Sequence, residues 1–294
     1  MSLQDKFILV VNPISGGHDK TELLESVKQY AQDKGVTLIE YETTGDNDEE
    51  VIKQLCIKHN PPRILVAGGD GTIKMVAEAL EKRDIIIGVL PAGSANGLSV
   101  DLELPEDVDE IIETAFNGKP MAMDMVSINK KMSLHLSDLG ANAELIKNYE
   151  GGKLRGKLGY ALQAFNTLKE LGDPFEADIK ANGETMRTEA RMIVIANTKR
   201  YGTGVTINPI GKMDDGKFEI VILKSLDPIL IGKILTGNMP VKDDENVDII
   251  STQEALIETN APVSFQIDGE YCGLTDKLDI KILHKQMKVS VPNF

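Results

Sequence analysis

Five residues, Gly68-Gly69-Asp70-Gly71-Thr72, have the composition and setting of a phosphate-binding loop. An apolar run, residues 64–67, precedes them, and apolar residues at helical spacing follow them at positions 73, 76, 77 and 80. Glycine lets backbone N–H groups approach a polyphosphate, and the N-terminus of the following helix attracts the same anion. Asp70 would then face a cation beside the phosphates or take the proton of an attacking hydroxyl. Asp-Gly also forms hairpin turns, but the helical spacing favours the phosphate loop.

Three more polar, glycine-bearing segments follow predicted strands in the first 120 residues. The predicted strands cover residues 7–11, 36–41, 64–67 and 85–90 and alternate with amphipathic segments, which predicts a parallel sheet covered by helices. The additional segments are residues 12–17, 43–46 and 91–97. Such turns meet at the carboxyl edge of an open α/β sheet, where ligands bind, so we expect four loops to line one site. Read alone, residues 12–17 and 91–97 are equally typical of ordinary loops.

After Pro120 the pattern is typical of strands joined by turns. Asn182-Gly183 predicts a hairpin between residues 175–181 and 185–196, and Asp215-Gly216 predicts another between 205–208 and 218–223. Further expected elements are a helix over residues 157–171 and final strands over 263–267, 278–283 and 288–291.

These patterns together predict an α/β fold. We expect a parallel-sheet nucleotide-binding domain over residues 1–122 and a second, mostly antiparallel β-rich domain over residues 123–294. The C-terminal end of the second domain is free to return to the first. With no long linker in the sequence, we expect the two domains to meet along a cleft.

Two carboxylate motifs in the second half are candidates for chemistry. Asp214-Asp215-Gly216 is either a hairpin turn or, through Asp215 and nearby carbonyls, a site for a divalent ion. Asp268-Gly269-Glu270 follows a short apolar strand and would orient a metal-bound water or accept a hydroxyl proton, although surface turns also have this composition. The basic cluster Lys153, Arg155 and Lys157 is either a triphosphate clamp or a solvated loop.

Charge and composition exclude several classes of protein. The formal net charge of −14 and the absence of tryptophan argue against a nucleic-acid binder, which needs a basic face and stacking side chains. Cys56 and Cys272 have no metal-binding spacing and suit a reducing cytosol. We find neither a signal-peptide pattern nor an apolar run of the ~18 to 20 residues needed to span a membrane. We therefore expect a cytoplasmic protein.

The three best-defined loops resemble those of the diacylglycerol kinase catalytic-domain family, which includes bacterial soluble lipid kinases and sphingosine kinases. Residues 12–16 are similar to the first nucleotide loop of the family, residues 68–72 to the central loop and residues 90–96 to the third. The central loop is the specific match among these three.

The second half resembles the same family. The family has a run of an Asn, an aromatic-Gly pair and a Pro in this half, and Asn197, Tyr201-Gly202 and Pro209 are similar to it. The Asp-Asp-Gly turn at 214–216 and the Asp-Gly-Glu motif at 268–270 then follow in the order of the family. The resemblance therefore covers the whole chain, and the two carboxylate motifs are its specific part here.

This resemblance implies an ATP-dependent lipid kinase that transfers the γ-phosphoryl group to a lipid hydroxyl, diacylglycerol-like or sphingoid-like, at a membrane surface. Glu270 would be the base, with Asp268 and Asp70 in its carboxylate and water network. Asp215 would hold Mg²⁺ together with the carbonyls of Lys212 and Lys217. ATP contacts would come from Asn12, Ser15, Gly16, Thr43, Gly68, Gly69, Asp70, Gly71, Thr72, Ser94 and Asn96.

The chain departs from the family pattern in two places. Lys74-Met75 stands where the family often has Asn-Glu, and Gly97 stands where bacterial diacylglycerol kinases often have Asp. The Gly-Ser-x-Asn form of the third loop is closer to the sphingosine kinases. The alternatives are transfer to a soluble acceptor, as in the related NAD kinases, and a nucleotide-binding regulator without turnover. Peripheral membrane attachment and homo-oligomer formation are both compatible with the sequence.

Overall fold

The computed structural model describes residues 6–17, 19–141, 143, 173–200, 205–240 and 244–293. The predicted helix over 157–171 and the basic cluster at 153–157 lie outside the described residues. The chain divides into two compact units: Met1–Met123 with Lys285–Phe294, and Asp124–His284. They are called unit 1 and unit 2 below, and each is described by itself.

Unit 1 is built on a parallel sheet with the strand order β4-β3-β1-β2. All four expected strands are present: β1 (Lys6–Val11), β2 (Thr37–Glu42), β3 (Arg63–Gly68) and β4 (Ile86–Pro91). Its helices are η1 (Ser15–Gly17), α1 (Thr21–Lys34), α2 (Asp48–His59), α3 (Asp70–Leu80), α4 (Gly97–Asp101) and α5 (Val108–Asn117). The prediction of an α/β fold with a parallel sheet is confirmed.

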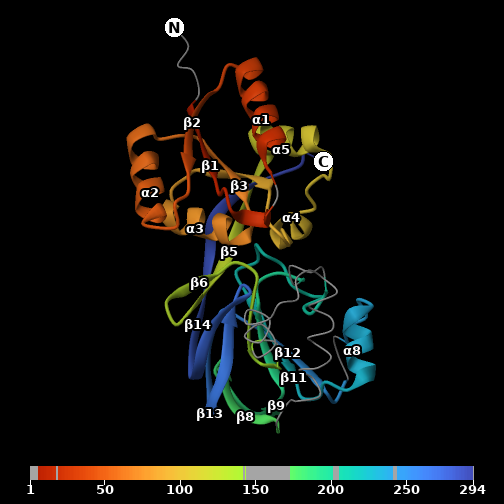
Figure 1. The fold of residues 1–294 in the computed structure, drawn as a ribbon. Helices are drawn as coiled ribbons and strands as arrows, with labels where there is room; N and C mark the ends of the chain where they lie inside the picture. The colour runs from red at the N-terminus through yellow and green to blue at the C-terminus, as the bar shows by residue number, and fades with distance from the viewer. Residues whose placement is uncertain are drawn as a thin grey trace. The chain divides into compact units, whose positions relative to one another are not determined.

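Both faces of this sheet are covered by helices, as its continuous apolar strands require. Phe7 and Leu9 pack in one buried cluster with Val27 of α1 and with Ile112 and Phe116 of α5. Figure 1 shows α1 and α5 on this side of the sheet and α2 and α3 on the other.

The C-terminal end of the chain adds a strand to unit 1. The last part of β14 (Glu270–Val291) pairs in parallel with β4 through Lys288 and Val289.

A half-buried arginine holds this added strand and the end of α5. The Arg63 guanidinium donates to Ala115 O (3.2 Å), Gly118 O (2.7 Å) and Ser290 Oγ (2.8 Å). Ser290 Oγ in turn donates to Thr114 O at 2.6 Å. A cation at the C-terminal end of a helix is stabilised by the helix dipole, and burial lowers the pKa of Arg63.

Unit 2 is the β-rich part of the chain. Its main strand order is β12-β11-β10-β7-β13-β14, and neighbouring strands in that order are antiparallel. The elements are β5 (Lys119–Ile128), β6 (Lys131–Ser133), β7 (Leu136–Gly140), β8 (Phe175–Ala181), β9 (Glu184–Ala190), β10 (Met192–Ala196), β11 (Phe218–Leu223), β12 (Val247–Thr252), β13 (Glu254–Ile267), β14 and the helix α8 (Pro228–Leu235). The second, antiparallel β-rich region is therefore confirmed.

The Asn182-Gly183 hairpin is confirmed, because both residues have positive φ and Ala181 pairs with Glu184 across the turn. The strand expected over 185–196 was wrong in extent. It breaks at Arg191 into β9, which pairs with β8, and β10, which pairs with β7 and β11.

The hairpin expected around Asp215-Gly216 was also wrong. Residues 205–208 form no strand, and Thr206 makes only an isolated bridge to Arg200. Strand β11 instead pairs with β10 and β12. The preceding segment contacts β11 through side chains, since Asn208 Nδ2 donates to the buried Glu219 at 2.7 Å.

The two final strands expected over 278–283 and 288–291 are one continuous strand, β14, which begins at Glu270.

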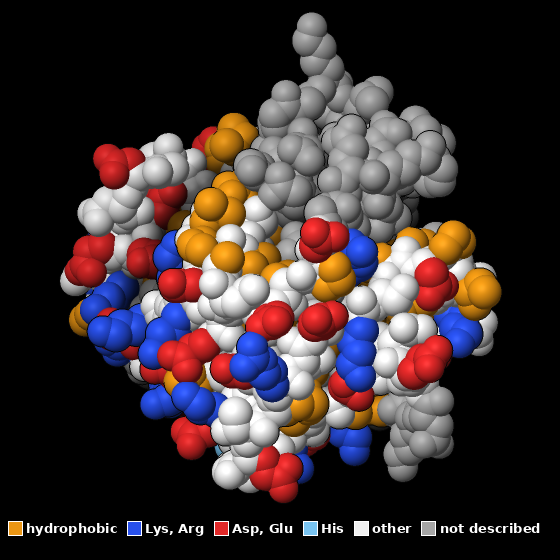
Figure 2. All heavy atoms as spheres, turned by 90° about the horizontal axis from the view of Figure 1, so that it is seen from below, with side chains coloured by type: hydrophobic (Ala, Val, Ile, Leu, Met, Phe, Trp, Pro, Cys, Tyr) orange, Lys and Arg blue, Asp and Glu red, His pale blue; other side chains and the backbone are white. Residues whose placement is uncertain are grey.

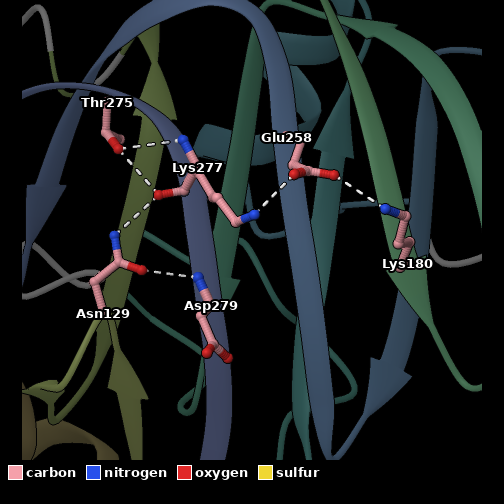
Figure 3. A network of polar contacts seen from close by, with 6 residues as sticks. All are labelled: Asn129, Lys180, Glu258, Thr275, Lys277 and Asp279. Carbon is pink, nitrogen blue, oxygen red and sulfur yellow. Dashed lines mark hydrogen bonds and ion pairs between the residues drawn. The ribbon is translucent and has the colours of Figure 1, made fainter.

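A surface network on unit 2 is set by strand register (Figure 3). Glu258 of β13 accepts from Lys180 of β8 at 3.0 Å and from Lys277 of β14 at 2.9 Å. Beside it, Asn129 pairs with the backbone of Lys277 and Asp279. The hydrogen bond from Lys277 is the main cause that lowers the pKa of Glu258. These are exposed ion pairs on paired strands, which is the arrangement of a solvated sheet face.

The acidic excess of the chain is not gathered on the face shown in Figure 2. Acidic and basic side chains are interspersed over it. Over the described part of that face, no broad field of one sign therefore stands out that would select a charged macromolecule.

Candidate functional site

Three of the four glycine-bearing loops of unit 1, those after β1, β3 and β4, lie together at the carboxyl edge of its sheet. Asn12, at the end of β1, donates from Nδ2 to Oγ1 of Thr72 in the first turn of α3 at 3.0 Å. Ser15 Oγ donates to Ala92 O, after β4, at 3.0 Å. The backbone N–H of Ala92 donates to Gly68 O at 2.9 Å. Hydrogen bonds therefore join each of the three loops to the other two.

Glycine is required where these loops touch. A Cβ on Gly16, which has φ +69°, would lie 2.6 Å from Ala92 O. A Cβ on Gly93 would lie 2.5 Å from the Cα of Gly69, and a Cβ on Gly69 would lie 3.2 Å from the Cα of Gly93. A Cβ on Gly68 would lie 2.6 Å from Oγ1 of Thr72. Gly71 differs, because no atom of the described part of the chain lies within 4 Å of the Cβ position there.

Asp70 is engaged by backbone groups of the third loop. Its Oδ2 accepts from Gly97 N at 2.7 Å, and its Oδ1 accepts from Leu98 N at 3.1 Å. These are the first two N–H groups of α4, so Asp70 supplies the acceptor that a helix N-terminus needs. Ser94 is exposed in the same loop, and Asn96 accepts from Gly93 N at 2.7 Å.

Lys20 supports the first loop from within. Its side chain is buried, and Nζ donates to Ser15 O at 2.6 Å and to Pro13 O at 3.3 Å. An ammonium under these carbonyls adds positive charge to a loop that is expected to bind phosphate. Sequence reasoning missed Lys20, because it lies in a polar segment after the motif and nothing nearby marks it as buried.

The loop after β2 is held by Asp48. Asp48 Oδ1 accepts from the Tyr41 hydroxyl at 2.6 Å and from Thr44 N at 2.9 Å, and Oδ2 accepts from Gly45 N at 2.8 Å. Burial opposes the ionisation of Asp48, but these hydrogen bonds lower its pKa below the ordinary 3.8. Thr43 itself donates its backbone N–H to Val11 O at 2.9 Å, so the loop after β2 lies next to the first loop, which follows β1.

In unit 2, the Asp-Gly-Glu motif is the turn between β13 and β14. Asp268 and Gly269 occupy its two central positions with φ +49° and +89°, and Ile267 pairs with Glu270. The Asp268 carboxylate accepts from Ser133 Oγ (3.0 Å), Leu134 N (2.9 Å) and His135 N (2.8 Å). Glu270 is exposed. The motif therefore separates an anchored carboxylate from one that faces solvent.

The Asp-Asp-Gly motif is a turn with two exposed aspartates and a buried glycine, and a residue that sequence reasoning missed fixes it. Asp124 is fully buried on β5, and its Oδ2 accepts from Gly216 N at 2.7 Å. Its backbone N–H donates to Met213 O, and its Oδ1 lies 2.8 Å from His284 Nδ1. The signal that could have found Asp124 is its charge inside the apolar stretch of β5. A lone charge in a buried strand signals a long-range partner.

The predicted metal ligands lie on this turn. Lys212, Asp215 and Lys217 are exposed, and Asp215 Oδ1 accepts from Lys217 N at 3.1 Å. Within the described ranges, no three His, Cys, Asp or Glu side chains converge as a ready-made metal cage. One carboxylate with two backbone carbonyls is nonetheless an all-oxygen set, which suits a hard cation that keeps several water ligands. The donor chemistry therefore fits Mg²⁺.

Two family models together match most of the chain. The diacylglycerol kinase catalytic domain matches residues 6–128, and the YegS C-terminal NAD kinase beta sandwich-like domain matches residues 138–289. The chain belongs to the diacylglycerol kinase catalytic-domain family, a family of kinases.

Named relatives agree with this family. A protein from Yersinia enterocolitica named "Probable lipid kinase YegS-like" is 27% identical over 274 residues, which cover 90% of this chain and 89% of the relative. A protein from Bacillus subtilis named "Diacylglycerol kinase" is 26% identical over 274 residues, which cover 90% of each chain.

A solved structure has the same fold. The crystal structure of a diacylglycerol kinase from Bacillus anthracis aligns with a TM-score of 0.75 and 20% identity, covering 100% of this chain and 99% of that chain. No helix among the residues that the structure describes is long and apolar enough to cross a membrane.

Proposed function

We propose that this protein is an ATP-dependent lipid kinase that transfers the γ-phosphoryl group of ATP to a lipid hydroxyl. The observation that carries the proposal is the convergence of three glycine loops on one sheet edge, in a chain of the diacylglycerol kinase family. Phosphoryl transfer depends mainly on positioning and on positive charge near the phosphates. The loops supply backbone N–H groups at the N-terminal end of α3, and Lys20 supplies a cation beneath the first loop.

The acceptor chemistry is assigned to the exposed member of the Asp-Gly-Glu turn. Glu270 would take the proton of the lipid hydroxyl, directly or through a water. The Asp268 carboxylate already accepts from three donors, so we assign it to fixing the turn. The same reasoning assigns Asp70 to shaping the third loop, because both of its oxygens accept backbone N–H groups. Mg²⁺, held by Asp215 and the two carbonyls, would stabilise the turn at 214–216.

A panel of acceptors tests this function. Purified protein is incubated with ATP labelled at the γ-phosphate, Mg²⁺ and mixed micelles of diacylglycerol, a sphingoid base or neither, with NAD as the soluble acceptor. We expect labelled lipid. Labelled NAD phosphate would instead support the NAD kinase alternative, and tight ATP binding without transfer to any acceptor would support a regulator.

Glu270→Gln tests the base within the same assay. The variant keeps the shape of the side chain and removes its basicity, so turnover should fall about 10²- to 10⁴-fold. ATP affinity, measured by calorimetry, should stay within about twofold, because the proposed ATP contacts are in unit 1. Near-full transfer by this variant would refute the assignment of Glu270.

A further inference from the structure

A cross-strand pair behind the Asp-Gly-Glu turn joins it to the buried part of unit 2. Gln266 on β13 lies directly opposite Asp138 on β7 in the strand register. Gln266 Nε2 donates to Asp138 Oδ2 at 2.5 Å, and both residues are buried, with 1% and 0% of their surfaces exposed. On its other side, Gln266 Oε1 accepts the backbone N–H of Gly269 at 2.7 Å. The three groups form a chain from β7 to the turn.

The chemistry of the two end groups fixes the orientation of the Gln266 amide. An ionised carboxylate only accepts hydrogen bonds, and a backbone N–H only donates. The NH₂ group of Gln266 must therefore face Asp138, and its carbonyl oxygen must face Gly269. With an amide in place of Asp138, only the Gly269 N–H would still oppose a flipped Gln266, so the preference for one orientation would be weaker.

The turn depends on these bonds because packing does little for it. Among the residues that the structure describes, none has an atom within 4 Å of a Cβ position on Gly269, so they leave this part of the turn unpacked. Asp268 and Gly269 both adopt left-handed backbone conformations, which carry strain for the non-glycine residue. Its anchors include the Asp268 carboxylate on residues 133–135, the Asp268 backbone N–H on Leu136 O at 3.1 Å, and Gln266 on Gly269.

We infer that Gln266 is a positioning residue for Glu270 and that Asp138 acts through it by fixing its amide. Gly269 N is one residue from Glu270, so a displacement at Gly269 moves the Glu270 carboxylate directly. The pair lies outside the family motif, which ends at Asp268 on this side. The inference rests on the proposed role of Glu270 as the base.

The first test replaces the amide and keeps the length. Gln266→Met removes the hydrogen bonds of the amide with Asp138, Leu136 O and Gly269 N and leaves a side chain of similar size. A displacement of about 1 Å at a catalytic group costs on the order of 10²-fold in rate, so we expect kcat to fall about 10- to 100-fold. KM for ATP should stay within about twofold. Asp138→Asn should produce a smaller loss of kcat in the same direction.

A double-variant cycle separates positioning from general damage. If Gln266 acts through Glu270, Gln266→Met should cost almost nothing further in a Glu270→Gln background. Equal losses in both backgrounds would show that Gln266 only stabilises unit 2, and full activity of Gln266→Met would also overturn the inference. High activity of Glu270→Gln alone would instead refute the proposed base, so the two failures are distinguishable.

A matched control and a second readout complete the design. Asn129→Ala removes another amide of unit 2 that bridges two groups. Asn129, at the β5–β6 turn, bridges the backbone groups of Lys277 and Asp279. Its turnover should stay within about twofold. Hydrogen exchange measured by NMR should show the Gly269 amide exchanging at least about tenfold faster in Gln266→Met than in the wild type, independently of any lipid acceptor. An unchanged exchange rate would contradict the anchor.

Discussion

Asp70→Asn tests whether the aspartate of the central loop acts as a helix cap. In the native protein the carboxylate accepts from Gly97 N at 2.7 Å and from Leu98 N at 3.1 Å, one oxygen for each N–H. Gly97 and Leu98 are both buried, so water does not readily replace a lost acceptor. Asparagine has one acceptor oxygen, so at least one of the two N–H groups loses its partner.

The expected loss follows from these two bonds. A buried N–H without a partner costs about 1 to 3 kcal/mol, and the lost negative charge at a helix N-terminus costs about 0.3 to 1 kcal/mol more. We therefore expect Asp70→Asn to lower the free energy of unfolding by about 2 to 3 kcal/mol. If Asp70 instead served only to bind a metal or a substrate, Asp70→Asn would raise the free energy of unfolding. Removing an unpaired carboxylate from a crowded site relieves its desolvation cost.

Urea unfolding in buffer without nucleotide or Mg²⁺ measures this loss, and amide exchange at Gly97 and Leu98 locates it. The control is Asp84→Asn, the same change on an aspartate of unit 1 whose side chain is 81% exposed and paired with Lys288. A surface pair contributes about 0 to 1 kcal/mol, so the control should change little. A loss below about 0.5 kcal/mol for Asp70→Asn, or unchanged exchange at both amides, would refute the capping role.

Three further predictions concern the other loops. Gly69→Val should abolish ATP binding in calorimetry, because even a Cβ would lie 3.2 Å from the Cα of Gly93; unchanged affinity would place the nucleotide elsewhere. Asp215→Ala should lower the melting temperature more in Mg²⁺ buffer than in chelator, and equal losses would indicate a simple turn residue. The depressed pKa of Asp48 stabilises the folded state above the unfolded value of about 3.9, and this contribution disappears as pH falls through the lower folded value. Asp48→Asn should therefore flatten the pH dependence of unfolding in that acidic range, and an unaltered profile would contradict it.

The parallel half of the fold was predictable because its signals are local. Each strand is an uninterrupted apolar run, each loop carries glycine, and each helix has its own spacing. The antiparallel half was less predictable, because its strands are defined by partners far away in the sequence. The residue types around Arg191 do not indicate that the strand pairs with β8 before this residue and with β11 after it. Residues 205–208 have a strand-like composition, but they contact β11 through the side chain of Asn208.

The same distinction applies to the candidate site. Motif residues were visible because they cluster within a few positions, and their assignment to ATP, Mg²⁺ and catalysis stays a prediction. Lys20, Asp124 and Gln266 were missed, since their importance comes from where their polar atoms point. Composition offered a signal for two of them. Asp124 and Gln266 are polar residues inside apolar strands, and such residues usually have a specific hydrogen-bond partner.

The return of the C-terminal strand to unit 1 imposes an order on folding during synthesis. Arg63 and its partner Ser290 are 227 positions apart. At about 5 to 20 residues per second, the ribosome needs roughly 10 to 45 s to deliver the second after the first. Through that interval β4 lacks β14 as its outer neighbour, and Arg63 lacks the Ser290 hydroxyl, one of its three acceptors. Until the residues of β14 that pair with β4 have been synthesised, the nascent unit 1 has an exposed sheet edge, the kind of surface that chaperones cover.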